Sequence, residues 1–294
     1  MTVKFKSTIV GFLPKVLGRK FIYSLRYFHQ RKKWPNLYAP KDLSEIIISN
    51  LLRNYYDRYV QYEDKVNVRD YIANKGLGNI LLKHYFVWDK TSDILIDELP
   101  EKFVLKTNNG GGGKNIFLCR DKRYFDFQTA IQKLENALST HDTFEKQYNL
   151  ITPKIICEEL VDTGSEAWPI DYKFTCIHGK VVDVFIGSGR EAGVKFCTKD
   201  INWNSLPYTK EEFLPENDPP KPTTLKEMIN VAQILSQDFP FVRVDLYEYN
   251  GRVYFSELTF TPWGGLMYSY KDEVIKEYGR LLREKPSDYV INNK

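Results

Sequence analysis

A hairpin near the end of the chain constrains the fold more than any other feature. Residues 241–247 and 252–260 are two runs rich in β-branched and aromatic side chains, and they flank the dipeptide Asn250-Gly251. This dipeptide between two such runs is typical of a tight turn that joins antiparallel strands. The sequence therefore predicts an antiparallel sheet.

The register of this hairpin decides which side chains share a face, because successive residues of a strand point to opposite faces. A two-residue loop, Asn250-Gly251, would place Asp245 and Glu257 on opposite faces. A three-residue loop that begins at Tyr249 pairs Arg243 with Glu257 and brings Asp245 to the same face. We predict the three-residue loop.

In the predicted register, Asp245, Glu257 and Thr259 lie on one face together with Arg243. Two carboxylates and a further oxygen ligand can hold one or two Mg²⁺ ions, which prefer oxygen and bridge readily to phosphate. A surface hairpin joined by salt bridges would carry the same residues, and it stays the alternative.

The remaining elements are predicted in mixed order. Helices are expected over residues 42–59, 63–75, 125–137, 224–237 and 272–283. Strands are expected over residues 103–106, 116–119, 154–161, 171–177 and 180–186, the last two joined by His178-Gly179 as a hairpin. Thr224 and Glu227 match a capping box, and residues 204–222, with five prolines, are expected to be irregular. Since strands and helices do not alternate regularly, we predict an α+β fold class with antiparallel sheets.

Four consecutive glycines, Gly110 to Gly113, follow the strand that ends at Lys106. Such a loop exposes successive backbone N–H groups that can cover the oxygens of a triphosphate. The spacing of a Walker loop is absent, so a nucleotide must be held in another way. A hairpin tip with no ligand would look the same.

Positive charge gathers at the start of the chain. Residues 1–33 carry nine Lys or Arg and no acid, and the rest of the chain holds 33 basic and 38 acidic residues. A slightly acidic body argues against nucleic-acid binding. Apolar residues recur every three or four positions in the basic segment: Ile9, Leu13, Val16, Leu17, Phe21, Leu25 and Phe28. We predict a basic amphipathic helix that starts near Pro14 and either packs on its own domain or attaches to an anionic membrane surface.

Cysteine and histidine usage bears on the cellular compartment. The four cysteines and four histidines are scattered, which argues against a disulfide framework and a zinc site. The chain has no apolar run of about 18 residues that could span a bilayer, and its first segment lacks the cleavage site of a secretory signal. We expect a soluble, cytoplasmic protein, with peripheral contact at the inner face of the cytoplasmic membrane as the second explanation of the basic helix.

Together these segments resemble the ATP-grasp family, and within it the TupA-like branch found among bacterial surface-polysaccharide enzymes. The carriers of the resemblance are residues 63–69, 99–106, 110–113, 158–160, 171–174, 243–245 and 257–259. The resemblance implies an ATP-grasp fold, in which two α+β subdomains with antiparallel sheets hold ATP between them. It places a basic helical region at residues 1–60, the first subdomain at 61–157 and the second at 158–294.

The resemblance also implies roles for single residues. Lys65 and Lys106 would hold the ATP phosphates beneath a cover formed by Asn108, Gly110, Gly111, Gly112 and Gly113. Glu158, Glu159 and Val161 would meet the adenine, and Asp171 or Lys173 would lie near the ribose or phosphates. Asp245, Glu257 and Thr259 would bind Mg²⁺, while Arg243 would stabilise the reacting oxygen.

Three departures from the family pattern limit this transfer. Thr259 stands where many members have Asn, and Asn108-Asn109-Gly110 stands where the branch often has Asn-His-Gly. Helices replace the Rossmann-like substrate domain that better understood ligases carry at their N-terminus. The acceptor pocket therefore cannot be inherited, although Arg190 is a candidate for pairing with a substrate carboxylate; a turn-capping role would suit Arg190 equally.

The activity implied by the resemblance is ATP-dependent ligation of a carboxylate to an amine through an acylphosphate. The product would be an amide that joins an amino acid or amino sugar to a uronic acid of a bacterial surface polysaccharide. Two other classes remain open: a sugar kinase that uses the same nucleotide site, and a glycosyltransferase or non-catalytic assembly subunit that needs neither Asp245 nor Glu257.

Overall fold

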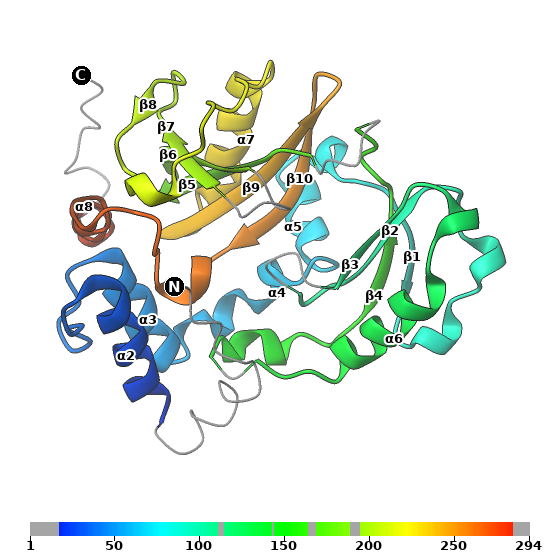
Figure 1. Cartoon of the computed structure of the whole chain (residues 1–294), viewed down its shortest axis with the longest axis horizontal. Helices are drawn as coiled ribbons and strands as arrows, with labels where there is room; N and C mark the ends of the chain where they lie inside the picture. The colour runs from blue at the N-terminus through cyan, green and yellow to red at the C-terminus, as the bar shows by residue number, and fades with distance from the viewer. Residues whose placement is uncertain (1–17, 111–114, 143, 164–168, 189–194, 285–294) are drawn as a thin grey trace.

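Two antiparallel sheets, one of four and one of six strands, organise the computed structural model of the chain (Figure 1). The structure describes residues 18–110, 115–142, 144–163, 169–188 and 195–284. Every strand pair in both sheets is antiparallel, and helices occur at the N-terminus and between the strands. The predicted α+β class is confirmed.

The smaller sheet has the strand order β1-β4-β2-β3. Its strands are β1 (His84–Trp88), β2 (Phe103–Thr107), β3 (Ile116–Cys119) and β4 (Ile155–Glu158). Helix α6 (Phe127–Leu138), capped by the Asp126 side chain, packs on β2 and closes a small core around Phe103 and Leu134. The sequence analysis did not predict β1, and it extended β4 to residue 161.

The larger sheet has the order β10-β9-β5-β6-β7-β8. Its strands are β5 (Asp171–Ile177), β6 (Lys180–Ser188), β7 (Lys195–Lys199), β8 (Ser205–Leu206), β9 (Phe241–Tyr249) and β10 (Arg252–Thr259). Helix α7 (Leu225–Ser236) packs against β9, β5 and β6, and α8 (Asp272–Arg283) packs against β5. The turn at His178-Gly179 is confirmed, with both residues in the left-handed region. The proline-rich stretch 204–222 holds only β8 and one turn of 3₁₀ helix.

The N-terminal helices are α2 (Arg19–Arg31), α3 (Leu43–Leu52), α4 (Val60–Glu63) and α5 (Val68–Asn74). Short 3₁₀ turns complete the chain path: η1 (Tyr55–Tyr59), η2 (Gly78–Ile80), η3 (Thr91–Asp93), η4 (Ile96–Glu98), η5 (Lys122–Tyr124), η6 (Lys146–Leu150), η7 (Glu211–Phe213) and η8 (Pro262–Gly265). The predicted helices over 42–59 and 63–75 are therefore interrupted. Left-handed Asn54 ends the regular part of the first helix, and extended Asp64 separates α4 from α5.

The capping box predicted at Thr224 and Glu227 is wrong. Thr224 precedes α7 with ψ 17°, and its hydroxyl makes no hydrogen bond. A capping side chain reaches the third helical N–H from an extended backbone, which Thr224 does not adopt. A complete capping box exists instead at the start of α3, where Asp42 and Glu45 bond each other's backbone N–H groups.

Helix α2 packs on its own domain, as one of the two explanations predicted. Tyr23 and Tyr27 are fully buried in the core that also contains the larger sheet. Arg31 is buried as well: it donates to the carbonyls of Met267 (2.5 Å) and Tyr270 (2.8 Å) and pairs with Asp272 (2.7 Å). The predicted helix start near Pro14 lies outside the described residues.

Replacing Gly279 by alanine should destabilise the fold, because α8 crosses α3 at this glycine. An added Cβ would stand 2.7 Å from the Cα atom of Asp42 and would also clash with the Lys41 carbonyl. Backbone atoms cannot yield as a side chain would, so we expect a loss of about 1–3 kcal/mol or more. Urea unfolding measures this loss, and Gly78→Ala, whose Cβ would meet nothing within 4 Å, is the control. Equal stability of the two variants would contradict the packing described.

Candidate functional site

The hairpin of β9 and β10 turns through two residues and not through the three that were predicted. Asn250 and Gly251 both have positive φ (50° and 69°), and Tyr249 pairs with Arg252. The predicted register is therefore wrong along the whole hairpin, and Glu257 pairs with Asp245 and not with Arg243 as predicted. A β-bulge between Phe255 and Glu257 adds one residue to β10, which shifts the pairing and changes the facing of all residues beyond it.

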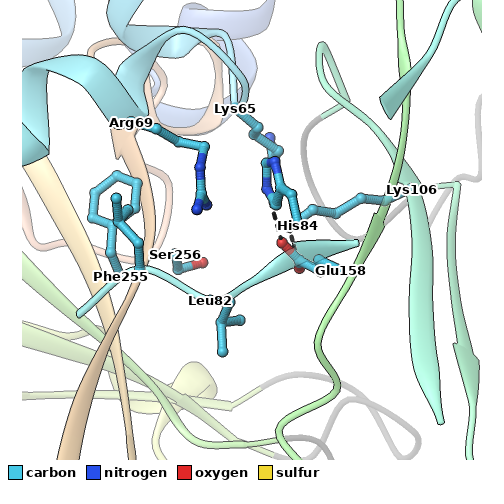
Figure 2. Close-up of a pocket in the computed structure, with 9 residues that line it drawn as sticks. Lys65, Arg69, Leu82, His84, Lys106, Glu158, Phe255 and Ser256 are labelled. Carbon is cyan, nitrogen blue, oxygen red and sulfur yellow. Dashed lines mark hydrogen bonds and ion pairs between the residues drawn. The ribbon is translucent and has the colours of Figure 1, made fainter. Parts of the chain in front are cut away.

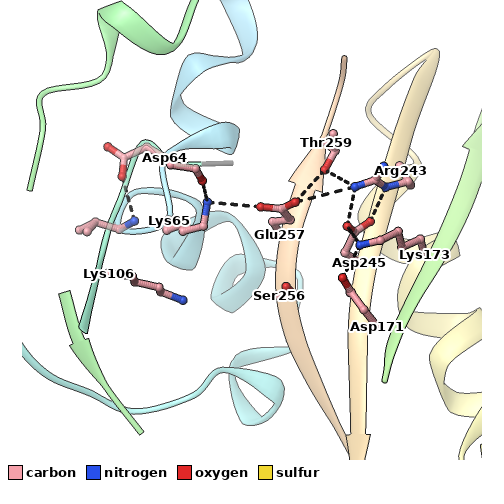
Figure 3. Close-up of polar contacts among 12 residues, drawn as sticks. Asp64, Lys65, Lys106, Asp171, Lys173, Arg243, Asp245, Ser256, Glu257 and Thr259 are labelled. Atoms are coloured by element: carbon pink, nitrogen blue, oxygen red, sulfur yellow. Dashed lines mark hydrogen bonds and ion pairs between the residues drawn. The ribbon is translucent and has the colours of Figure 1, made fainter. Parts of the chain in front are cut away.

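Beyond the bulge, Glu257 pairs directly with Asp245 and Thr259 pairs with Arg243. The four side chains thus share a face as predicted, although a bulge and not a longer loop puts them there. Lys173 of β5 lies opposite Asp245 on the other side of β9. Three neighbouring strands therefore deliver the polar group drawn in Figure 3.

Arg243 is the centre of this group. Its guanidinium donates to both oxygens of Asp245 (Nε to Oδ1, 2.7 Å; Nη2 to Oδ2, 2.6 Å) and to Thr259 Oγ1 (3.2 Å). Glu257 Oε1 lies 3.8 Å from Nη2. Lys173 donates to Asp245 Oδ2 (2.7 Å) and pairs with Asp171. Planar, bidentate pairing of this kind fixes the orientation of both partners.

The cations around Glu257 keep it ionised. Burial raises the pKa of Glu257, but Lys65, Lys173 and Arg243 together lower it to about 2. Burial also raises the pKa of Asp245, and Arg243 and Lys173 oppose that effect. The pKa of Asp245 remains raised on balance, whereas the neighbouring cations maintain the negative charge of Glu257 inside a largely desolvated group.

The donor set fits Mg²⁺. An ionised carboxylate offers about four lone-pair sites, and Arg243 and Lys173 occupy three of those on Asp245. Glu257 is the more open ligand, because its side chain is 26% exposed. Asp245, Glu257 and the Thr259 hydroxyl together supply the oxygen ligands that Mg²⁺ prefers.

A second polar group lines the pocket between the sheets (Figure 2). Lys106 of β2 pairs with Glu158 at the end of β4, and His84 Nε2 lies 3.5 Å from the other oxygen of Glu158. Burial raises the pKa of Glu158, but Lys106 and His84 lower it to about 2.

Lys65 connects the two groups. Its ammonium donates to the Gly110 carbonyl (2.6 Å) and lies 3.3 Å from Glu257 Oε2. Asp64 fixes this segment by accepting bonds from Val66 N (2.8 Å) and Asn108 Nδ2 (3.0 Å). Lys65 therefore stands between the pocket and the face that carries Glu257.

The other predicted residues divide into three sets. Asn108 is buried; its side chain donates to Asp64 and to the Thr152 carbonyl and accepts from the Lys154 backbone N–H. Glu159 is exposed and accepts from the Lys83 backbone N–H (3.3 Å), whereas Val161 is buried. Gly111, Gly112, Gly113 and Arg190 lie outside the described residues.

Three polar residues of the pocket were missed from the sequence: Arg69, His84 and Ser256. His84 begins β1 and pairs with Glu158, so the aromatic run after it, Tyr-Phe-Val-Trp, was the available signal. Ser256 is the bulged residue of β10, and its position could not follow from a regular hairpin. Arg69 lies on α5 and ends the segment 63–69 that carries the resemblance, but no role was predicted for it.

Lys106 and the buried Glu158 on one antiparallel sheet, together with Asp245, Glu257 and Arg243 on a second, form the arrangement expected of an ATP-grasp protein. The model of the TupA-like ATP-grasp family matches residues 46–284, and the chain therefore belongs to that family. No curated protein matches the chain.

Solved structures of ligases are similar to this chain at low identity. The L-amino acid ligase of Bacillus licheniformis is 12% identical with a TM-score of 0.51, and the match covers 92% of this chain and 63% of that one. The D-alanine–D-alanine ligase of Helicobacter pylori is 15% identical with a TM-score of 0.44, with coverage of 76% and 61%. The chain thus spans less than two thirds of either ligase.

Proposed function

We propose that this chain is an ATP-dependent carboxylate–amine ligase. The γ-phosphoryl group of ATP passes to a substrate carboxylate, and an amine then displaces phosphate from the acylphosphate to form an amide. The observation that carries the proposal is the facing pair Asp245 and Glu257, with Arg243 bonded to the first and close to the second. Bound there, Mg²⁺ would neutralise charge that develops on the transferring phosphoryl oxygens.

The residues of the chain have separate tasks in this reaction. Lys65 and Lys106 now pair with Glu257 and Glu158. When ATP binds, its phosphates would take the place of these carboxylates as partners of the two ammonium groups. Arg243 presents fixed N–H donors to the oxygen that becomes negative when the carboxylate is phosphorylated and again when the amine attacks. Glu158, Glu159 and Val161 are the proposed adenine contacts, with Asp171 or Lys173 at the ribose or phosphates.

Trapping the acylphosphate tests the ligase proposal. The full chain is incubated with ATP, Mg²⁺ and uronic-acid oligosaccharides, and hydroxylamine replaces the amine. We expect one ADP per hydroxamate formed. A phosphorylated sugar as the only product, formed equally well without an amine, would instead identify a kinase. The chain would be an assembly subunit if it did not bind ATP and if variants of Asp245 and Glu257 kept full activity in polysaccharide assembly.

The class of substrate is proposed from the membership of the chain in the TupA-like ATP-grasp family. We infer that the carboxylate belongs to a uronic acid of a bacterial surface polysaccharide of the capsule, lipopolysaccharide or teichuronopeptide type, and that the amine is an amino acid or amino sugar. The cytoplasm, which supplies ATP, is the proposed site of reaction. Mass spectrometry of the amide product identifies both partners.

Lys65→Ala and Lys106→Ala should each weaken ATP binding by about tenfold or more, because each removes a cation that faces the phosphates in the ground state. Calorimetric titration with Mg·ATP measures the change. Lys195→Ala removes a lysine of β7 that bonds only the exposed Glu212 carbonyl and serves as the control. Unchanged affinity in both site variants would contradict the proposed phosphate contacts.

Membrane attachment is proposed for the outer face of α2. Phe21, Leu25 and Phe28 are 37–47% exposed, and Trp34 stacks on Phe28 (4.9 Å). The exposed cations Lys20, Arg26 and Lys32 accompany them, which suits an anionic lipid surface. None of the described helices is both long and apolar enough to cross a bilayer.

A variant with Phe21, Leu25 and Phe28 all replaced by serine should bind vesicles that contain phosphatidylglycerol about tenfold more weakly, since three apolar anchors are lost. The substitutions keep the buried face of α2, whose tyrosines belong to the core. Leu95, Leu150 and Leu214 are equally exposed elsewhere, and their triple serine variant is the control. Equal co-sedimentation of the two variants would leave α2 with a packing role only.

A further inference from the structure

A group of buried polar side chains lies at the far end of the candidate site from the pocket. Its members come from α4, from η6 with the residue before it, and from the segment after β10: Glu63, Glu145, Gln147, Tyr148 and Thr261. Helix α4 contacts both η6 and β10. The reaction proposed above assigns none of these residues a task.

Glu63 is the unusual member. It is only 4% exposed, and neither of its carboxylate oxygens accepts a well-formed hydrogen bond from the residues that the structure describes. Burial raises the pKa of Glu63 well above its ordinary value and Glu145 raises it further, whereas the nearby Gln147 amide opposes the shift. A buried carboxyl group without good partners costs stability, so stability does not explain its presence.

Glu145 is half-buried, and its charge acts on Glu63. The Thr261 hydroxyl donates to Glu145, and Gln147 Nε2 donates to Thr261 Oγ1 (3.2 Å). Burial raises the pKa of Glu145 to about 7, and the Thr261 hydrogen bond opposes this effect. Gly264 packs against this carboxylate, since a Cβ there would be in ordinary contact with Glu145 Oε2 at 3.6 Å.

The order of residues along β10 places these acids relative to the reaction. Ser256 lines the pocket, Glu257 and Thr259 form the proposed metal face, and Thr261 follows. Two residues span at most about 7 Å of chain, so Thr261 and its partner Glu145 border the metal face on the side away from the pocket. The charge of Glu257 acts on Glu63, Glu145 and Tyr148 alike.

The chemistry of the group selects a small cation. Two carboxyl groups offer several acceptor sites, and an ammonium supplies three N–H donors. The N–H donors of a protonated amine therefore match the acceptors of this group.

We propose that Glu63 and Glu145 bind the ammonium group of the amine substrate. This assignment rests on the proposed ligase function. In that function an amine must lie beside the acylphosphate, whose reacting oxygen is placed at Arg243. It gives the acidic pair a reason to persist in the fold, and it defines the amine substrate as one that enters as a primary ammonium.

Thermal unfolding of the full chain tests the assignment without turnover. A non-hydrolysable ATP analogue with Mg²⁺ is added first, and glucosamine or single L-amino acids follow at millimolar concentration. We expect the nucleotide to raise the melting temperature of the wild-type chain, and at least one amine to raise it further by several degrees. The N-acetylated form of that amine should add nothing.

Glu63→Gln and Glu145→Gln should each remove most of the amine-dependent shift and keep the nucleotide-dependent shift. Glu98→Gln, at an exposed acid of the smaller subdomain, should keep both. A wild-type chain that does not respond to the nucleotide overturns the ligase proposal and this assignment with it. A nucleotide response without any amine response, or an amine response that both glutamine variants retain, overturns the amine site alone.

Discussion

ADP formation should fall by about 10²- to 10³-fold when Glu257 is replaced by glutamine or Asp245 by asparagine, because each change removes a charged oxygen ligand from the proposed Mg²⁺ site. The expected loss is in turnover, since Lys65 and Lys106 still contact the phosphates. A second measurement needs no substrate: the part of the ATP-induced thermal shift that depends on Mg²⁺ should disappear in both variants.

Glu248→Gln is the matched control for these variants. Glu248 lies on the same hairpin, pairs with Val253 across from the turn, and accepts a hydrogen bond from Thr223 Oγ1 (2.6 Å) that glutamine can also accept. It should keep wild-type turnover and the Mg²⁺-dependent shift. ADP formation at the wild-type rate by the Asp245→Asn, Glu257→Gln double variant would refute a catalytic role for the hairpin.

Arg243→Lys should lower kcat by about 10²- to 10³-fold and change KM for ATP much less. Lysine keeps the positive charge but cannot reproduce the two parallel bonds to Asp245 or the third bond to Thr259. The donors aimed at the reacting oxygen are then lost from their fixed positions, which is an effect on the transition state and not on ATP binding. Steady-state ADP formation over a range of ATP concentrations separates the two constants.

Arg280→Lys provides the comparison for this substitution. Arg280 lies on the outside of α8, where it forms exposed ion pairs with Glu277 and Glu284, so little change is expected. If Arg243→Lys retained wild-type kcat, a positive charge alone would suffice, and the geometry of the guanidinium would have no role in the reaction.

The chemistry of the site could be predicted from the sequence more fully than the path of the backbone. The residue types at 243, 245, 257 and 259 indicated one polar face, and the structure has that face. The predicted loop was nevertheless wrong, because a regular hairpin admits only one register for each loop length. A bulge depends on the packing of a whole sheet, and nothing in the sequence around Ser256 marks one.

Helix ends were harder to predict than helix positions for a related reason. The apolar spacing of residues 42–59 continues through Asn54, yet this residue adopts a left-handed conformation that ends the regular helix.

The acidic pair Glu63 and Glu145 is separated by 82 positions and meets only through tertiary contacts. The domain boundaries predicted at 60/61 and 157/158 remain predictions, although the second falls within β4.

Because the hairpin contains a bulge at Ser256, the number of residues between Asp245 and Glu257 decides whether the two carboxylates share a face. Changing that number by one separates them, and changing it by two does not. Deleting one residue from the turn or from the bulge would send Glu257 to the opposite side of the sheet, whereas removing one residue at each place would restore it. Engineered hairpins can therefore be shortened or lengthened by pairs of residues without separating the two carboxylates. A search motif with a fixed number of residues between Asp245 and Glu257 would overlook chains whose hairpins differ by such a pair.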